Sequence, residues 1–98
     1  MKILALEMEA ANTTEHDFRP HLKAEAAGVW ELCQAGIIRE IYFREDAQIA
    51  VLILECESRE EAQKALGTLP LVRKGLITFE VIPLVPYTGF LRLFASEV

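Results

Sequence analysis

Residues 37–57 read IIREIYFREDAQIAVLILECE, and this stretch is the clearest guide to the architecture of the chain. Residues 37–44 and 48–57 form two runs rich in β-branched and aromatic side chains, which is typical of strands. The connection between them is Glu45-Asp46-Ala47, a length that suits a hairpin. We therefore expect two antiparallel strands in the middle of the chain.

A helical pattern flanks this hairpin on each side. Before it, residues 21–35 place apolar side chains at helical spacing, and Gly36 follows where a left-handed residue would end the helix. After it, Ser58 and Glu61 match the S-x-x-E capping box, which predicts the start of a second helix. That helix is expected to carry Leu69 on its apolar side and to end near Pro70.

Two more strands are predicted at the ends of the chain, because residues 2–9 and 76–84 alternate with a period of two. In the connection after the first of them, Thr14 and Asp17 can cap a short turn of helix. The order strand, helix, strand, strand, helix, strand predicts an α+β fold of ferredoxin-like βαββαβ type. Residues 1–98 are then one domain, a four-stranded antiparallel sheet with two helices on one face.

The face of the sheet away from the helices predicts self-association. We expect it to carry Ile3, Ala5 and Glu7, then Ile49, Val51, Ile53 and Glu55, then Thr78, Glu80 and Ile82. A face this apolar usually marks an interface, and residues 85–98 continue it as an apolar carboxyl-terminal arm. The chain is therefore predicted to form a homodimer or larger oligomer, sheet against sheet, as a dimeric α+β barrel.

Composition argues against several other classes of protein. The net charge is −5 and no stretch gathers Lys and Arg, so nucleic acid is not an expected partner. The longest apolar runs are far shorter than the roughly 20 residues of a membrane span, so no membrane association is expected. The amino terminus lacks a signal-peptide pattern, and Cys33 and Cys56 are interpreted as reduced thiols in a cytoplasmic protein.

From Gly36 onward the chain resembles the muconolactone isomerase family, a branch of the dimeric α+β barrel proteins. The residues that carry this resemblance are Glu31-Leu32, Gly36, Arg39, Ser58, Glu60, Leu66, Leu69-Pro70-Leu71 and Phe79-Glu80-Val81. The resemblance implies an isomerase that moves a double bond in a small unsaturated lactone bearing a carboxylate, without a metal or organic cofactor. The central hairpin departs from the family, because Glu40, Tyr42 and an aliphatic run stand where the family has aromatic and His residues.

Such a reaction needs a base, a donor for the enolate oxygen and a cation for the substrate carboxylate. Arg39 is the candidate clamp for the carboxylate, unless it pairs with Glu7, Glu55 or Glu80 across the sheet. Glu40 and Tyr42 are candidates for base and donor, unless they belong to a half-exposed strand face.

Three further residues are candidates for the site. His16 and His21 suit proton transfer near neutral pH, although a histidine in a polar loop is usually solvated. Trp30 can form the wall of a substrate pocket or simply pack in the core.

Two other functions stay open. One is a ligand-binding or regulatory module without catalysis, which a purely aliphatic pocket with Arg39 and the histidines pointing away would favour. The other is a cofactor-independent monooxygenase, which would require an open cavity lined by aromatic rings. The chain contains no Ser–His–Asp, P-loop, GxGxxG or HExxH pattern.

Overall fold

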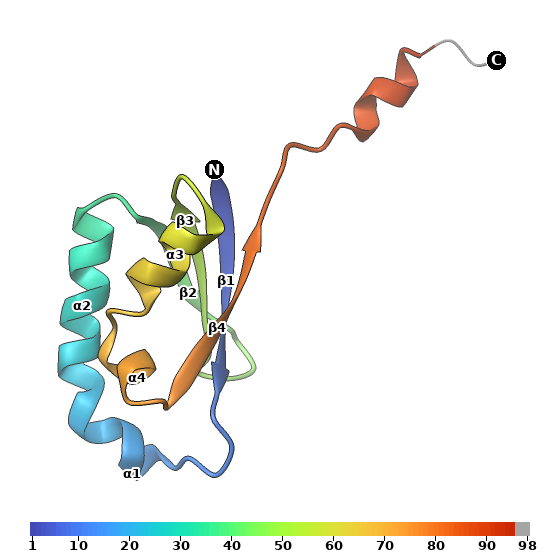
Figure 1. Ribbon diagram of the computed structural model, residues 1–98. Coiled ribbons are helices and arrows are strands. Elements are labelled where there is room, and N and C mark those ends of the chain that lie inside the picture. The colour runs from blue at the N-terminus through green and yellow to red at the C-terminus, as the bar shows by residue number, and fades with distance from the viewer. Residues whose placement is uncertain (96–98) are drawn as a thin grey trace.

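The computed structural model describes residues 1–95. The last three residues of the predicted arm at 85–98, residues 96–98, lie outside the described residues. Four strands form one antiparallel sheet in the order β2-β3-β1-β4. Their bounds are β1 Lys2–Glu9, β2 Ile38–Phe43, β3 Ala50–Glu55 and β4 Ile77–Pro83. All helices of the domain body lie on one side of this sheet, as Figure 1 shows. The predicted ferredoxin-like fold is thus confirmed.

The first helical segment begins with the short helical turn that Thr14 and Asp17 predict. A short helix α1 (Glu15–Phe18) and a 3-10 turn η1 (Arg19–His21) precede α2 (Leu22–Gln34). The predicted cap is present, because the Asp17 carboxylate accepts a hydrogen bond from the Thr14 backbone N–H at 2.8 Å. Helix α2 ends before Gly36, whose φ of +77° is the left-handed conformation expected of a terminating glycine.

The second helical segment consists of two helices, whereas the sequence pattern predicts one. Helix α3 (Arg59–Leu66) starts at Ser58, whose Oγ accepts a hydrogen bond from the Glu61 N–H at 3.1 Å. Helix α4 (Pro70–Arg73) follows after a short turn. The prediction was wrong here because Pro70 has no N–H to donate and its fixed φ suits a first helical position, so it starts a helix instead of ending one.

The core lies between the helices and the face of the sheet that they cover, which we call the covered face. It is formed by Ile3, Ala5, Leu52 and Leu54 of the two central strands together with Ala62 and Leu66 of α3. Val29, Leu32 and Cys33 of α2 complete the contact. Each of the four strand side chains is almost fully removed from water.

The opposite face of the sheet, which we call the open face, has no helix over it. Its side chains are Leu4, Leu6 and Met8 of β1, Val51, Ile53 and Glu55 of β3, Glu40 and Tyr42 of β2, and Thr78, Glu80 and Ile82 of β4. The prediction for β1 was therefore wrong, because Ile3 and Ala5 lie in the core. Both sides of β1 are apolar, so alternation alone does not tell which side faces the helices. Pairing of Ile3 with Leu54 and of Ala5 with Leu52 decides it.

The carboxyl-terminal segment leaves the sheet after β4 and projects away from the body of the domain (Figure 1). It contains a 3-10 helix, η2 (Gly89–Leu93), and the Tyr87 and Phe90 rings stack edge to face at 4.9 Å. Val85 and Phe94 are 81% and 83% exposed. A segment this apolar and this exposed has no packing partner within its own described chain.

Candidate functional site

One row of the covered face creates a hollow in an otherwise filled core. Phe43 of β2 pairs with Ala50 of β3, Ala50 donates to Glu7 of β1, and Glu7 pairs with Phe79 of β4. The neighbouring rows hold Leu52 or Leu54 at the β3 position, where this row has only the methyl group of Ala50. The small side chain leaves space on the covered face, and Glu7, Phe43 and Phe79 all line this space.

This space is a cavity of about 790 Å³ between the sheet and the first helical segment. Its walls are mostly apolar and include the aromatic residues Phe18, Trp30, Phe43 and Phe79 together with Leu22, Val29, Ile41 and Leu52. A volume of this size is within the range of about 300–1,000 Å³ that is usual for sites of small ligands. The cavity is the candidate functional site.

Glu7 stands on the floor of this cavity. Its side chain is half-buried, and Oε1 accepts a hydrogen bond from the Ala50 backbone N–H at 3.2 Å. Burial raises the pKa of the Glu7 carboxyl, and repulsion from Glu9 and Glu25 adds to this effect, while the hydrogen bond opposes it. Glu7 is thus a carboxyl group that holds its proton to a higher pH than an exposed glutamate.

Glu25 reaches the cavity from the opposite wall, in the first turn of α2. Its Oε1 accepts a hydrogen bond from the Leu71 backbone N–H at 2.9 Å, and this N–H belongs to the first turn of α4. Burial raises the pKa of the Glu25 carboxyl too. The bond therefore holds the carboxyl group in place and joins α2 to α4.

The polar part of the cavity wall is strongly acidic. Glu9 and Glu15 line it in addition to Glu7 and Glu25. Over the described residues, its lining contains no Lys, Arg or His. Glu15 forms an ion pair with Arg19 at 3.0 Å, while no ion pair of the described residues involves Glu7, Glu9 or Glu25. Those three carboxylates therefore have no internal cation to balance them.

Of the six residues predicted for the site, Trp30 lies in the wall of this cavity. Its ring is 64% exposed, so it forms part of the rim and does not pack fully in the core. Its role as a wall of a substrate site stays a prediction from the sequence.

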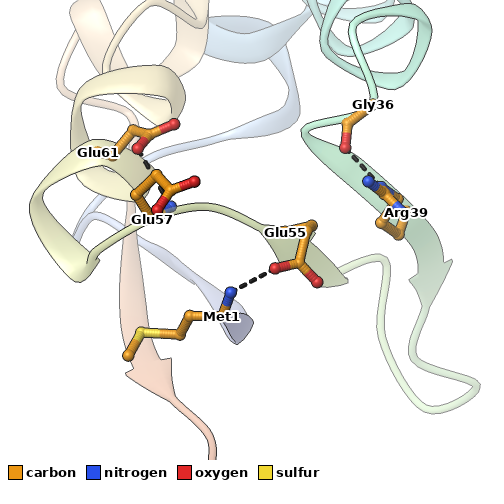
Figure 2. A network of polar contacts seen from close by, with 6 residues as sticks. All are labelled: Met1, Gly36, Arg39, Glu55, Glu57 and Glu61. Atoms are coloured by element: carbon orange, nitrogen blue, oxygen red, sulfur yellow. Dashed lines mark hydrogen bonds and ion pairs between the residues drawn. The ribbon is translucent and has the colours of Figure 1, made fainter.

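Arg39, Glu40 and Tyr42 lie outside the cavity. Arg39 stands at an irregularity of β2, where its Nε donates to the Gly36 carbonyl oxygen at 2.6 Å (Figure 2). Tyr42 donates its hydroxyl to Glu40 Oε1 at 2.7 Å on the open face, and this bond raises the pKa of Tyr42. Glu40 and Tyr42 are thus brought together, but on the other side of the sheet from Glu7.

Glu55, one of the glutamates considered as a partner of Arg39, forms an ion pair with the amino group of Met1 (Figure 2). This contact lowers the pKa of the Glu55 carboxyl. Arg39 thus has its closest polar contact with the backbone.

The two histidines are also separate from the cavity. His16 is exposed on α1, and His21 is half-buried at the end of η1. Neither lines the cavity wall. Catalytic roles for them stay predictions from the sequence.

Sequence reasoning missed Glu25 and assigned Glu7 to an interface. Glu25 lies four residues before Val29 and eight before Cys33, on the same face of the first helix. That spacing is the signal that would have found it. For Glu7 the deciding information is the register of β1, which sequence alternation does not contain.

Residues 1–95 contain no group of three or more His, Cys, Asp or Glu side chains arranged to hold a metal ion. Within the same residues, no helix has the length and apolar character needed to cross a membrane.

Comparison with known proteins identifies a similar structure but no family. No family model matches the chain, and no curated protein matches it by sequence. A solved structure of 5-chloro-2-hydroxyhydroquinone dehydrochlorinase from Burkholderia phenoliruptrix AC1100, in complex with 2,5-dihydroxybenzoquinone, aligns with a TM-score of 0.71. The alignment covers 91% of this chain and 98% of that chain at 17% identity. The two chains share the ferredoxin-like fold.

Proposed function

We propose that this chain is a cofactor-free enzyme that transfers a proton on a small ring-shaped carbonyl compound, the reaction type of the muconolactone isomerase family. One observation carries the proposal, which is the pair of half-buried carboxyl groups on opposite walls of a cavity with apolar sides. The dehydrochlorinase with the same fold was solved with a small ring compound, which supports a ligand of this size.

Two carboxyl groups with raised pKa values suit this chemistry. A base works best when its pKa lies near the working pH, because it is then ionised and still a good proton acceptor. In the proposed reaction ionised Glu7 removes a proton from the carbon next to the carbonyl, and the Glu7 carboxylic acid then returns this proton to another carbon of the enolate, so that the double bond moves. Protonated Glu25 donates to the developing enolate oxygen from the opposite wall. Mutual repulsion favours one ionised and one protonated carboxyl, since a first charge opposes the second.

We further propose that the enzyme is a homodimer formed by open face against open face, which would make it a dimeric α+β barrel. The open face exposes Met8 and Tyr42 at 48% and 57%, and the remaining apolar side chains of its central strands are only partly covered. Arg39, Glu40 and Tyr42 would then lie at the interface. They would then contribute to the contact between protomers and not to the reaction in the cavity.

Two alternative functions have specific observations in their favour. A ligand-binding module is supported by the position of Arg39 and both histidines away from the cavity. A cofactor-independent monooxygenase is supported by the four aromatic side chains in the wall. The first would bind ring compounds without turnover, and the second would consume oxygen.

A proton-exchange assay tests the proposal. Ring lactones and ketones, muconolactone included, are incubated with the protein in deuterium oxide, and exchange next to the carbonyl is followed by NMR. Double-bond movement is followed by ultraviolet absorbance. We expect exchange with at least one compound, reduced about 100-fold by Glu7→Gln and within twofold of the unchanged protein for Arg39→Ala.

The two variants separate the cavity from the site predicted from the sequence. Loss of activity in Arg39→Ala, with activity retained in Glu7→Gln, would indicate that the active site lies on the open face and not in the cavity. Absence of exchange with every compound would leave the ligand-binding module as the leading function. Oxygen uptake measured in the same samples would identify a monooxygenase.

A further inference from the structure

The cavity wall contains both carboxylates and aromatic rings, and the carboxylates are not spread evenly over it. Glu7 and Glu9 stand in the second half of β1, Glu15 begins α1, and Glu25 is in the first turn of α2. These segments meet at one end of the domain, where β1 ends and α2 begins (Figure 1). The carboxylates are therefore gathered at one end of the cavity.

The aromatic rings lie at the same end. Phe79 pairs directly with Glu7, and Phe43 is the next large side chain along the same row, beyond Ala50. Phe18 belongs to α1 and also lines the cavity. The face of an aromatic ring attracts a cation, and a nearby carboxylate strengthens this attraction in a partly desolvated site.

We propose that this cavity selects organic cations, namely small ring compounds that carry a protonated amine. The inference deepens the proposed function, since it assigns an ammonium group to the ring substrate in place of the carboxylate that the sequence resemblance implies. An anionic ligand would meet Glu7, Glu9 and Glu25, which form no ion pair within the described residues, and no basic side chain in the described cavity wall. An ammonium group would supply the missing counter-charge and lie against the phenyl rings.

The pH dependence of binding should have a definite sign. The groups that face Glu7 are Glu9 from its own strand, Glu15 from α1, and Glu25 and Cys33 from α2. Because burial holds the pKa of Glu7 and Glu25 above the ordinary value, both carboxyls ionise fully only at higher pH. Affinity for an ammonium ligand should therefore increase as pH rises through this range, and affinity for a neutral ligand should stay constant.

Three probes of one shape test the proposal on the intact chain: benzylamine, benzyl alcohol and benzoate. The chain contains one tryptophan, Trp30, at the cavity rim, so ligand binding can be followed by its fluorescence and checked by calorimetry. At pH 7.5 we expect benzylamine to bind at least tenfold more tightly than benzyl alcohol. Benzoate should bind more weakly than the alcohol, and only the amine should gain affinity between pH 5 and pH 7.5.

Matched variants locate the effect. Glu7→Gln and Glu25→Gln should each weaken benzylamine binding about fivefold to tenfold and leave benzyl alcohol within twofold. Both keep a side-chain oxygen for the backbone hydrogen bond, so the fold is retained. Glu60→Gln removes an exposed carboxylate from α3, outside the cavity, and should leave all three affinities unchanged.

Benzoate binding as tight as benzylamine binding, or equal effects of Glu60→Gln and Glu25→Gln, would overturn the inference. Its failure is distinct from failure of the proposed function. Amine selectivity without any proton exchange would refute the enzyme and keep the cation site. Proton exchange on uncharged or anionic rings without amine selectivity would refute the cation site and keep the enzyme.

Discussion

The covered and open faces of the sheet are made from similar side chains but have different properties. On β3, Leu52 and Leu54 point to the helices and are 1% and 0% exposed. Val51 and Ile53, which alternate with them along the strand, are half-buried. The hydrophobicity of the strand is nearly the same on both sides. The helices on one side, and not the composition of the strand, make one face a core and leave the other available to a partner.

Glutamates follow the same division. On the covered face, burial raises the pKa of Glu7, because a charge in a partly dry site is poorly solvated. On the open face, the Met1 amino group lowers the pKa of Glu55. A carboxylate thus becomes a candidate acid or base on one side of the sheet and an ordinary ion-pair partner on the other.

The largest expected difference between the faces is in stability. Leu54→Ala should lower the free energy of unfolding by about 3 kcal/mol, because it leaves a void in a filled core. Ile53→Ala, one residue away on the open face, should lower it by about 1 kcal/mol, because this site is already half exposed. Urea denaturation at low protein concentration measures both. Equal effects would mean that the open face is packed within a single chain.

The second test compares two carboxylates on opposite faces. Glu25→Gln removes the proposed acid and should reduce proton exchange about 30-fold, within the range of acid–base contributions. Glu40→Gln, on the open face, should change the rate by less than twofold. Rates from the deuterium-exchange assay decide between them. A larger loss for Glu40→Gln would favour the catalytic role that the sequence predicts for Glu40.

The third test concerns self-association. Val51→Lys places a charge in the centre of the open face and should weaken the proposed dimer at least tenfold, because the ammonium would be buried without a partner. Gln63→Lys adds the same charge on an exposed position of α3 and should have no effect. Size-exclusion chromatography with light scattering measures the mass. An unchanged chain that is monomeric at micromolar concentration would refute the dimer.

The smallest effect is on the pH dependence of stability. The folded-state pKa of Glu7 is raised, so the folded chain binds more protons than the unfolded chain between the two pKa values, and stability falls as pH rises through this window. Glu7→Gln should therefore raise the free energy of unfolding at pH 7.5, because it removes a charge that burial disfavours.

At pH 4 the same substitution should have little effect, since the Glu7 carboxyl is then protonated in both states. Thermal unfolding across this pH range provides the measurement. Glu60→Gln, at an exposed site, is the control and should show no such trend. A gain that is equal at both pH values would assign the effect to packing and not to charge.

Local signals predicted most of the elements. The hairpin followed from two β-rich runs three residues apart, and the start of α3 followed from the capping box at Ser58. Gly36 ended α2 as its position predicts. These features depend on neighbours in the chain, so residue identity and spacing are enough to find them.

The candidate site was different, since none of its deciding contacts is local. Ala50 and Glu7 are 43 residues apart, and Glu25 and Leu71 are 46 residues apart. Arg39, Glu40 and Tyr42 have suitable chemical groups, but strand register places Glu40 and Tyr42 on the face without a cavity. The family resemblance agreed with the fold and did not include Glu7 or Glu25 among its residues.

The amino-acid sequence alone therefore determined the order of the elements, the caps of the helices and the ferredoxin-like class, because these follow from short-range periodicity and backbone preference. The tertiary structure decided which side of β1 is buried, where Ala50 leaves a hollow, and which glutamates share it. Alternation is symmetric between the two sides of a strand, and only pairing and helix packing break that symmetry.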